Sequence, residues 1–155
     1  MHPDTAAANL LLQRALGGSA VESFGLSHQI HFLEFRDTGP DDHLLSVDTE
    51  MTTNVGFNEA LGLTADERLL LVFNRVNLRG VTRVACDDEA NLFIDFDNGV
   101  HLRFAGTSVD GYEPWQLGSR TPLDEPGGYL LIAQCGGGYA IWEGPTTSPA
   151  QGQNA

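Results

Sequence analysis

The sequence predicts a β-rich α+β fold made of two tandem repeats, each a helix followed by antiparallel strands, packed as one domain with pseudo-twofold symmetry. Helix-forming residues fill positions 5–16, and a capping-box pair opens a second helix at Thr64. Apolar and polar residues alternate through most of the remaining chain, as half-buried strands require. A chain of 155 residues suits one core, so we expect a single domain over residues 1–143.

The two helices differ in their end signals. The first is expected over residues 5–16, with Asp4 or Thr5 as its N-cap and a glycine pair as its stop. For the second, Thr64 and Glu67 have the spacing of a capping box, and apolar residues follow at helical intervals. The leucine-rich run that follows also suits a buried strand, and the cap favours the helix.

An internal repeat organises the rest of the chain. Repeat 1 covers about residues 5–51 and repeat 2 about residues 64–106, with further strands expected over 129–143. The blocks Phe32-Leu33-Glu34-Phe35 and Phe93-Ile94-Asp95-Phe96 agree in chemical type at each position. The alternative is that the two blocks agree by coincidence, because any two helix–hairpin units share this alternation of apolar and polar residues.

The hairpin register follows from the same parity. A three-residue loop ending at Gly99 pairs Ile94 with Leu102 and gathers the apolar side chains on one face, with Gly99 left-handed. A two-residue turn would set charged residues opposite core residues. In the first repeat, the equivalent register pairs Leu33 with Leu45.

Composition excludes several classes of function. Acidic residues outnumber basic ones 21 to 8, the formal net charge is −13, and no residue is lysine. This charge opposes direct binding to nucleic acid or to an anionic membrane, and the missing lysine excludes P-loop, kinase and Schiff-base chemistry. No basic-then-apolar leader opens the chain and no apolar run reaches a membrane span of about 18 residues, so we expect a cytoplasmic protein.

Candidate catalytic and metal-binding groups do not converge. The alternation along each strand places His31 and His43 on the apolar face of the sheet and His101 on the opposite face. This separation argues against a metal site. Cys86 and Cys135 lie in apolar runs and are expected to be buried free thiols. A pairing of Cys86 with His101 stays open, but nothing marks the thiol as activated. We therefore expect no catalytic residue, metal or cofactor.

The acidic side chains give the strongest functional signal. Two groups of five acids, at 37–50 and 87–97, contain no base and fall on corresponding hairpins of the two repeats. They favour docking of a basic partner, and the alternative is that they keep the protein soluble and block edge-strand pairing. The expected contact residues are Asp37, Asp41, Asp42, Asp48, Glu50, Asp87, Asp88, Glu89, Asp95, Asp97, Tyr112 and Trp115.

Three motifs in the second half carry a resemblance. They are Asp97-Asn98-Gly99 between two strands, Tyr-Glu-Pro-Trp-Gln-Leu at 112–117, and a Gly-Gly-Gly-Tyr-Ala-Ile-Trp ending at 136–142. Over residues 64–143 the chain resembles small, acidic, uncharacterised bacterial proteins, which are similar in size and charge to immunity proteins of toxin systems. The resemblance implies a binding protein and brings no catalytic residues.

These observations predict a non-enzymatic acidic protein that neutralises a basic protein, as the immunity partner of a bacterial toxin. One alternative is a nucleic-acid mimic that inhibits a nuclease or a defence complex. Another is a small hydrolase or ligand-binding domain. Residues 144–155, which are small and polar, are expected to form a disordered tail.

Overall fold

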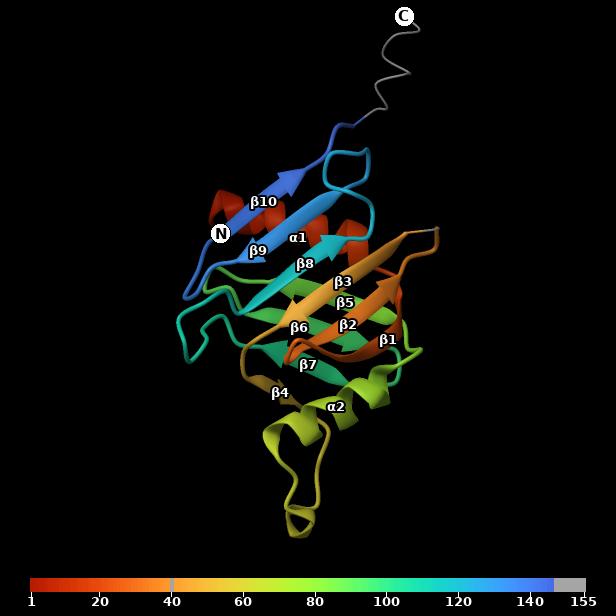
Figure 1. Ribbon diagram of the computed structural model, residues 1–155, viewed down its shortest axis with the longest axis vertical. Coiled ribbons are helices and arrows are strands. Elements are labelled where there is room, and N and C mark those ends of the chain that lie inside the picture. The colour runs from red at the N-terminus through yellow and green to blue at the C-terminus, as the bar shows by residue number, and fades with distance from the viewer. Residues whose placement is uncertain (40, 147–155) are drawn as a thin grey trace, which may run out of the picture.

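Two antiparallel sheets and two α-helices make up the protein in a computed structural model that describes residues 1–39 and 41–146 (Figure 1). The strand orders are β1-β2-β3-β8-β9-β10 and β4-β7-β6-β5. The elements are α1 (Pro3–Leu16), β1 (Ala20–Ser27), β2 (Ile30–Arg36), β3 (Asp42–Val47), β4 (Met51–Thr53), the 3₁₀ turn η1 (Glu59–Leu61), α2 (Ala65–Val76), β5 (Val81–Cys86), β6 (Leu92–Phe96), β7 (His101–Phe104), β8 (Trp115–Ser119), β9 (Tyr129–Ala133) and β10 (Tyr139–Glu143). The β-rich α+β class is therefore confirmed.

The six-stranded sheet lies over the four-stranded one, and their facing sides form the core (Figure 1). Helix α1 contacts β5 and β10, whereas α2 contacts β1. The ring of Phe73 on α2 meets that of Phe104 on β7 edge to face, with centroids 6.3 Å apart. The outer faces of both sheets carry neither helix. No helix among the described residues has the length and apolar character to cross a membrane.

The predicted hairpin registers are confirmed. Leu33 pairs with Leu45 across β2 and β3, and Ile94 pairs with Leu102 across β6 and β7. Both Leu33 and Ile94 are fully buried, as their parity requires. Gly99 has a φ of +83°, a backbone conformation that side chains with a Cβ rarely adopt.

The second helix is confirmed and the first begins earlier than expected. Thr64 and Glu67 form the capping box of α2 in both directions. Helix α1 starts at Pro3, and His2 is its N-cap, so the expected cap at Asp4 or Thr5 is wrong. Proline fits the first helical position because its fixed φ suits the helix and no amide hydrogen is needed there.

The last third of the chain supplies three strands to the larger sheet. Strand β8, which the sequence pattern did not identify, lies between β3 and β9 and joins the first repeat to the C-terminal hairpin. Of the expected tail 144–155, residues 147–155 lie outside the described part. Gly144 still donates a backbone hydrogen bond to the Gly128 carbonyl, at 2.7 Å.

Side chains of α1 cover the outer edge of β5. The amide of Asn9 binds both backbone groups of Cys86, accepting from its N–H at 2.8 Å and donating to its carbonyl at 2.9 Å. One turn later, Gln13 donates to the Val84 carbonyl at 3.0 Å. The helix thus satisfies backbone groups that an edge strand otherwise exposes.

Candidate functional site

The predicted acidic residues do not form one surface. Those of the first group divide between the β2–β3 loop with the first residue of β3 (37–42) and the β3–β4 connection (48–50), at opposite ends of β3. Those of the second group divide between the β5–β6 turn (87–89) and the β6–β7 hairpin (95–97). The site therefore depends on which carboxylates remain free to bind a partner.

The carboxylates of the β5–β6 turn hold local structure. Asp87 Oδ1 accepts from the Glu89 and Asn91 backbone N–H groups, at 3.0 and 2.9 Å. Asp88 Oδ1 accepts from the His2 N–H at 3.0 Å, and this hydrogen bond lowers the pKa of Asp88. The turn and the start of α1 are thus tied together by groups that the sequence predicts to dock a partner.

The carboxylates of the second hairpin are also engaged. Asp95 Oδ1 lies 2.9 Å from His101 Nδ1 on the outer face of the four-stranded sheet. Asp97 Oδ2 accepts from the Gly80 N–H at 3.1 Å, which joins the hairpin to the start of β5. The carboxylates of Asp95 and Asp97 are therefore already bound within the protein, whereas the docking prediction requires them to be free for a partner.

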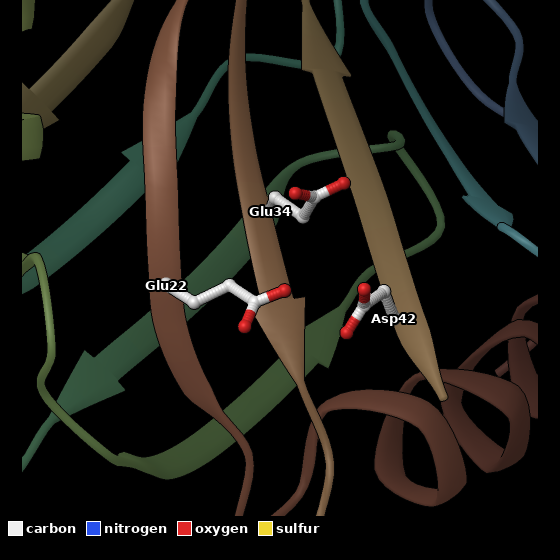
Figure 2. Close-up of side chains that lie close together, drawn as sticks. All are labelled: Glu22, Glu34 and Asp42. Carbon is white, nitrogen blue, oxygen red and sulfur yellow. The ribbon is translucent and has the colours of Figure 1, made fainter. Parts of the chain in front are cut away.

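Three carboxylates cluster on the outer face of the six-stranded sheet, where Glu22, Glu34 and Asp42 point toward one another from β1, β2 and β3 (Figure 2). Their oxygens lie within 4.8 Å of one another, a spacing that suits a metal ion. Arg36 Nε donates to Glu22 at 2.9 Å and to Asp42 at 3.2 Å, and Arg120 Nε donates to Glu34 at 2.6 Å. Two guanidinium groups therefore supply the positive charge that a cation would bring.

A buried polar network crosses the inner face of the same sheet. His43 Nδ1 lies 2.6 Å from the Tyr129 hydroxyl, and His43 Nε2 lies 3.0 Å from Asp37 Oδ2. The hydrogen bond with His43 lowers the pKa of Asp37, while burial raises the pKa of Tyr129. The order of groups is that of a catalytic triad, but a buried phenol with a raised pKa is not an activated nucleophile. We therefore assign this hydrogen-bond network a structural role and not a catalytic one.

The cysteine–histidine alternative is not supported by the geometry. Cys86 faces the core and His101 projects from the outer face of the same sheet, where it binds Asp95. Burial raises the pKa of the Cys86 thiol to about 11, so the thiol is protonated at neutral pH. Cys135 is exposed, and the expectation that it is buried is wrong because it lies in the turn between β9 and β10.

Of the two predicted contact aromatics, one is a core residue. Trp115 is 1% exposed, and its indole N–H donates to the Ala90 carbonyl at 2.7 Å. Its ring packs against that of Tyr139, with centroids 5.8 Å apart. Trp115 therefore joins the two sheets as a core residue, and only its edge lines a surface hollow. Tyr112 is 68% exposed and remains available to a partner.

Four carboxylates line a groove of about 780 Å³ around β4 and the start of α2. Two come from the β3–β4 connection, one from the first turn of α2 and one from the loop between β7 and β8. They are Asp48, Glu50, Asp66 and Asp110. Arg68 also lines this acidic groove, so its acidic side chains outnumber its basic one.

Two of the four carboxylates of the acidic groove are unpaired. Within the described residues, the side chains of Asp48 and Glu50 form neither a hydrogen bond nor an ion pair. Asp66 Oδ1 lies 3.3 Å from His31 Nε2, a ring nitrogen that is buried without a hydrogen-bond partner. Asp110 accepts from the Tyr112 N–H at 3.1 Å. Asp66, Asp110 and His31 were not predicted, because the groove joins segments far apart in the sequence.

A second hollow of about 440 Å³ adjoins the acidic groove. Ile30, Phe32 and Leu44 from the outer face of the six-stranded sheet line it, together with the exposed Tyr112. Val47 and Asp48, at the end of β3, line both cavities, which are therefore adjacent. We call this second cavity the apolar hollow.

Comparisons of the chain with protein-family models, with curated proteins and with solved structures found no match. The site is therefore interpreted from its own chemistry.

Proposed function

We propose that this is a non-enzymatic, cytoplasmic binding protein that neutralises a basic protein, as the immunity partner of a bacterial toxin. The observation that carries the proposal is the set of four carboxylates around the acidic groove, of which Asp48 and Glu50 are unpaired, in a chain of net charge −13. Unpaired carboxylates beside a cavity attract a basic surface and speed its association.

The two alternatives have less support. A nucleic-acid mimic needs carboxylates in rows that imitate phosphates, whereas the acidic residues of this chain lie at separate ends of the fold. Three of them, Asp87, Asp88 and Asp97, accept hydrogen bonds from backbone N–H groups of this chain. A hydrolase that uses Cys86 needs a thiolate, and burial disfavours that form.

We also propose that the two repeats arose by duplication and are related by a pseudo-twofold axis. Each repeat's first strand has a bulge at an equivalent place, after Val21 in β1 and after Val81 in β5. Ala20, the first residue of β1, forms an antiparallel bridge with Gly80, which directly precedes β5. Equivalent truncations, Leu33→Ala and Ile94→Ala, are then expected to destabilise the protein by similar amounts, about 2–5 kcal/mol each.

The test begins with capture of the partner from the source organism and with inspection of the neighbouring genes for a toxin. Association and dissociation rates are then measured at low and high salt. A basic partner whose association slows as salt rises supports the proposal, as does relief of toxicity when the two proteins are co-expressed. An acidic partner, or binding that is indifferent to salt, would refute it.

A charge-reversal pair sharpens the test. Asp48→Arg with Glu50→Arg alters the acidic groove, and Asp124→Arg with Glu125→Arg makes the same change of charge at another exposed loop. We expect the first pair to weaken binding far more than the second. Reversal within the β5–β6 turn is a poorer choice, because Asp87 and Asp88 hold backbone groups there.

A further inference from the structure

We infer that the partner inserts a basic side chain into the acidic groove and an adjacent apolar side chain into the apolar hollow, so that its segment straddles Asp48. This inference rests on the proposed function and names the chemistry of the segment that is bound. It follows from the charge of one cavity, the lining of the other and the two residues that they share, Val47 and Asp48.

The charge of the acidic groove selects a cation. Asp48 and Glu50 are exposed and have no side-chain partner within residues 1–39 and 41–146, and Asp66 and Asp110 lie on the other walls. Hydrogen bonds to ionised groups are the stronger kind in proteins, and a guanidinium group presents several donors at once. An arginine or lysine side chain therefore gains contacts that a neutral side chain does not.

The apolar part of the acidic groove suits the stem of such a side chain. Met51, Phe57 and Leu69 line the cavity beside the carboxylates. Long basic side chains bury their methylene stems along apolar surface while the charged head reaches polar groups. A small inorganic cation would make no use of these three residues.

One ring nitrogen in the acidic groove lacks a partner. His31 Nε2 is buried, forms no hydrogen bond, and lies 3.3 Å from Asp66 Oδ1. The Asp66 carboxylate beside it also lines the groove, and a basic side chain that enters there brings N–H donors for this carboxylate.

The apolar hollow defines the second half of the segment. Phe32 and Leu44 project from the uncovered face of the six-stranded sheet, and Tyr112 stands beside them with 68% of its surface exposed. Exposed aromatic and aliphatic groups around a hollow commonly anchor an apolar side chain of a partner. Because Asp48 lines both cavities, the basic and apolar side chains must be close together on the partner.

Four-residue peptides provide the probe. The peptides acetyl-Gly-Arg-Phe-Gly-amide, acetyl-Gly-Gln-Phe-Gly-amide and acetyl-Gly-Arg-Ser-Gly-amide are titrated into the ¹⁵N-labelled protein at low salt. We expect the first to shift the amide signals of residues 48–51 and 112 together, and to bind about tenfold more tightly than the peptide without arginine. Equal binding of the arginine and glutamine peptides, or shifts confined to other surfaces, would overturn the inference.

Neutral variants connect the peptide result to the captured partner. Asp48→Asn with Glu50→Gln is expected to weaken both peptide and partner about fivefold or more, whereas Asp124→Asn with Glu125→Gln changes neither. Tyr112→Ala should weaken the arginine–phenylalanine peptide and leave the arginine–serine peptide unchanged.

The two proposals fail in different ways. If a basic partner binds with salt dependence and both neutral pairs behave alike, the inference about the groove is refuted and the proposed function stands. If the captured partner is acidic, the proposed function is refuted and the inference is refuted with it.

Discussion

Removing one buried oxygen tests the polar network beneath the six-stranded sheet. The Tyr129 hydroxyl lies 2.6 Å from His43 Nδ1, and the two residues are 6% and 5% exposed. Tyr129→Phe deletes this hydroxyl and keeps the aromatic ring, which stacks on the imidazole with centroids 5.7 Å apart. The variant therefore isolates the hydrogen bond from the packing.

The magnitude follows from what the substitution leaves behind. His43 Nε2 remains bound to Asp37, so the imidazole stays in place and Nδ1 becomes a buried group without a partner. An unsatisfied buried donor or acceptor costs about 1–3 kcal/mol. No cavity larger than the lost oxygen forms, so we expect the free energy of unfolding to fall by about 1–3 kcal/mol.

Denaturant unfolding measures this change, with Tyr112→Phe as the matched control. Tyr112 is 68% exposed, so loss of its hydroxyl is expected to change the free energy of unfolding by about 0.5 kcal/mol or less. Equal effects for the two variants, with unchanged denaturant slopes, would show that the buried hydrogen bond does not stabilise the fold.

Four further predictions concern stability and reactivity. Ile94→Ala is expected to lower the free energy of unfolding by about 2–5 kcal/mol, measured by denaturation, because Ile94 is fully buried in a matched register. Gly99→Val should lower it by about 1–3 kcal/mol through positive-φ strain alone, because open space surrounds the added Cβ. The native pKa of Asp37 lies below its usual 3.8, so its contribution to stability is present above that pH and lost below it. Asp37→Asn should therefore flatten acid unfolding below about pH 4, and an unchanged acid transition would contradict the assignment. A thiol reagent should modify Cys135 in the native protein and Cys86 only after unfolding, as peptide mass mapping would show.

The sequence predicts the hairpins because their determinants are local. Alternating side chains and a left-handed glycine fix the pairing of Ile94 with Leu102 without knowledge of the rest of the fold. The six-stranded sheet is different, since β8 enters between β3 and β9 from far along the chain. Parity predicted that His43 faces inward, but its partner Tyr129 comes from a strand two places away.

The same reasoning explains the partial prediction of the site. Asp48 and Glu50 belong to an acidic run that composition reveals, and both line the groove. Composition does not show that Asp87 and Asp88 accept backbone hydrogen bonds, since the donors lie in a turn and at the chain's distant start. Trp115 was predicted as a contact residue but is buried, because an aromatic residue in a loop-like motif can also pack into the core.

The hold of α1 on β5 also constrains how the chain can assemble during synthesis. Asn9 and Gln13 leave the ribosome some 70 residues before the backbone groups that they bind, because the pairs are separated by 77 and 71 positions. Before β5 leaves the ribosome, the helix has only part of its final contacts. After β5 has emerged, the edge of this strand stays unpaired until the helix docks on it. Early cleavage or displacement of the N-terminus would leave β5 as a template for pairing between chains. We therefore expect docking of the first sixteen residues to limit pairing of β5 with other chains, independently of any binding by the acidic groove.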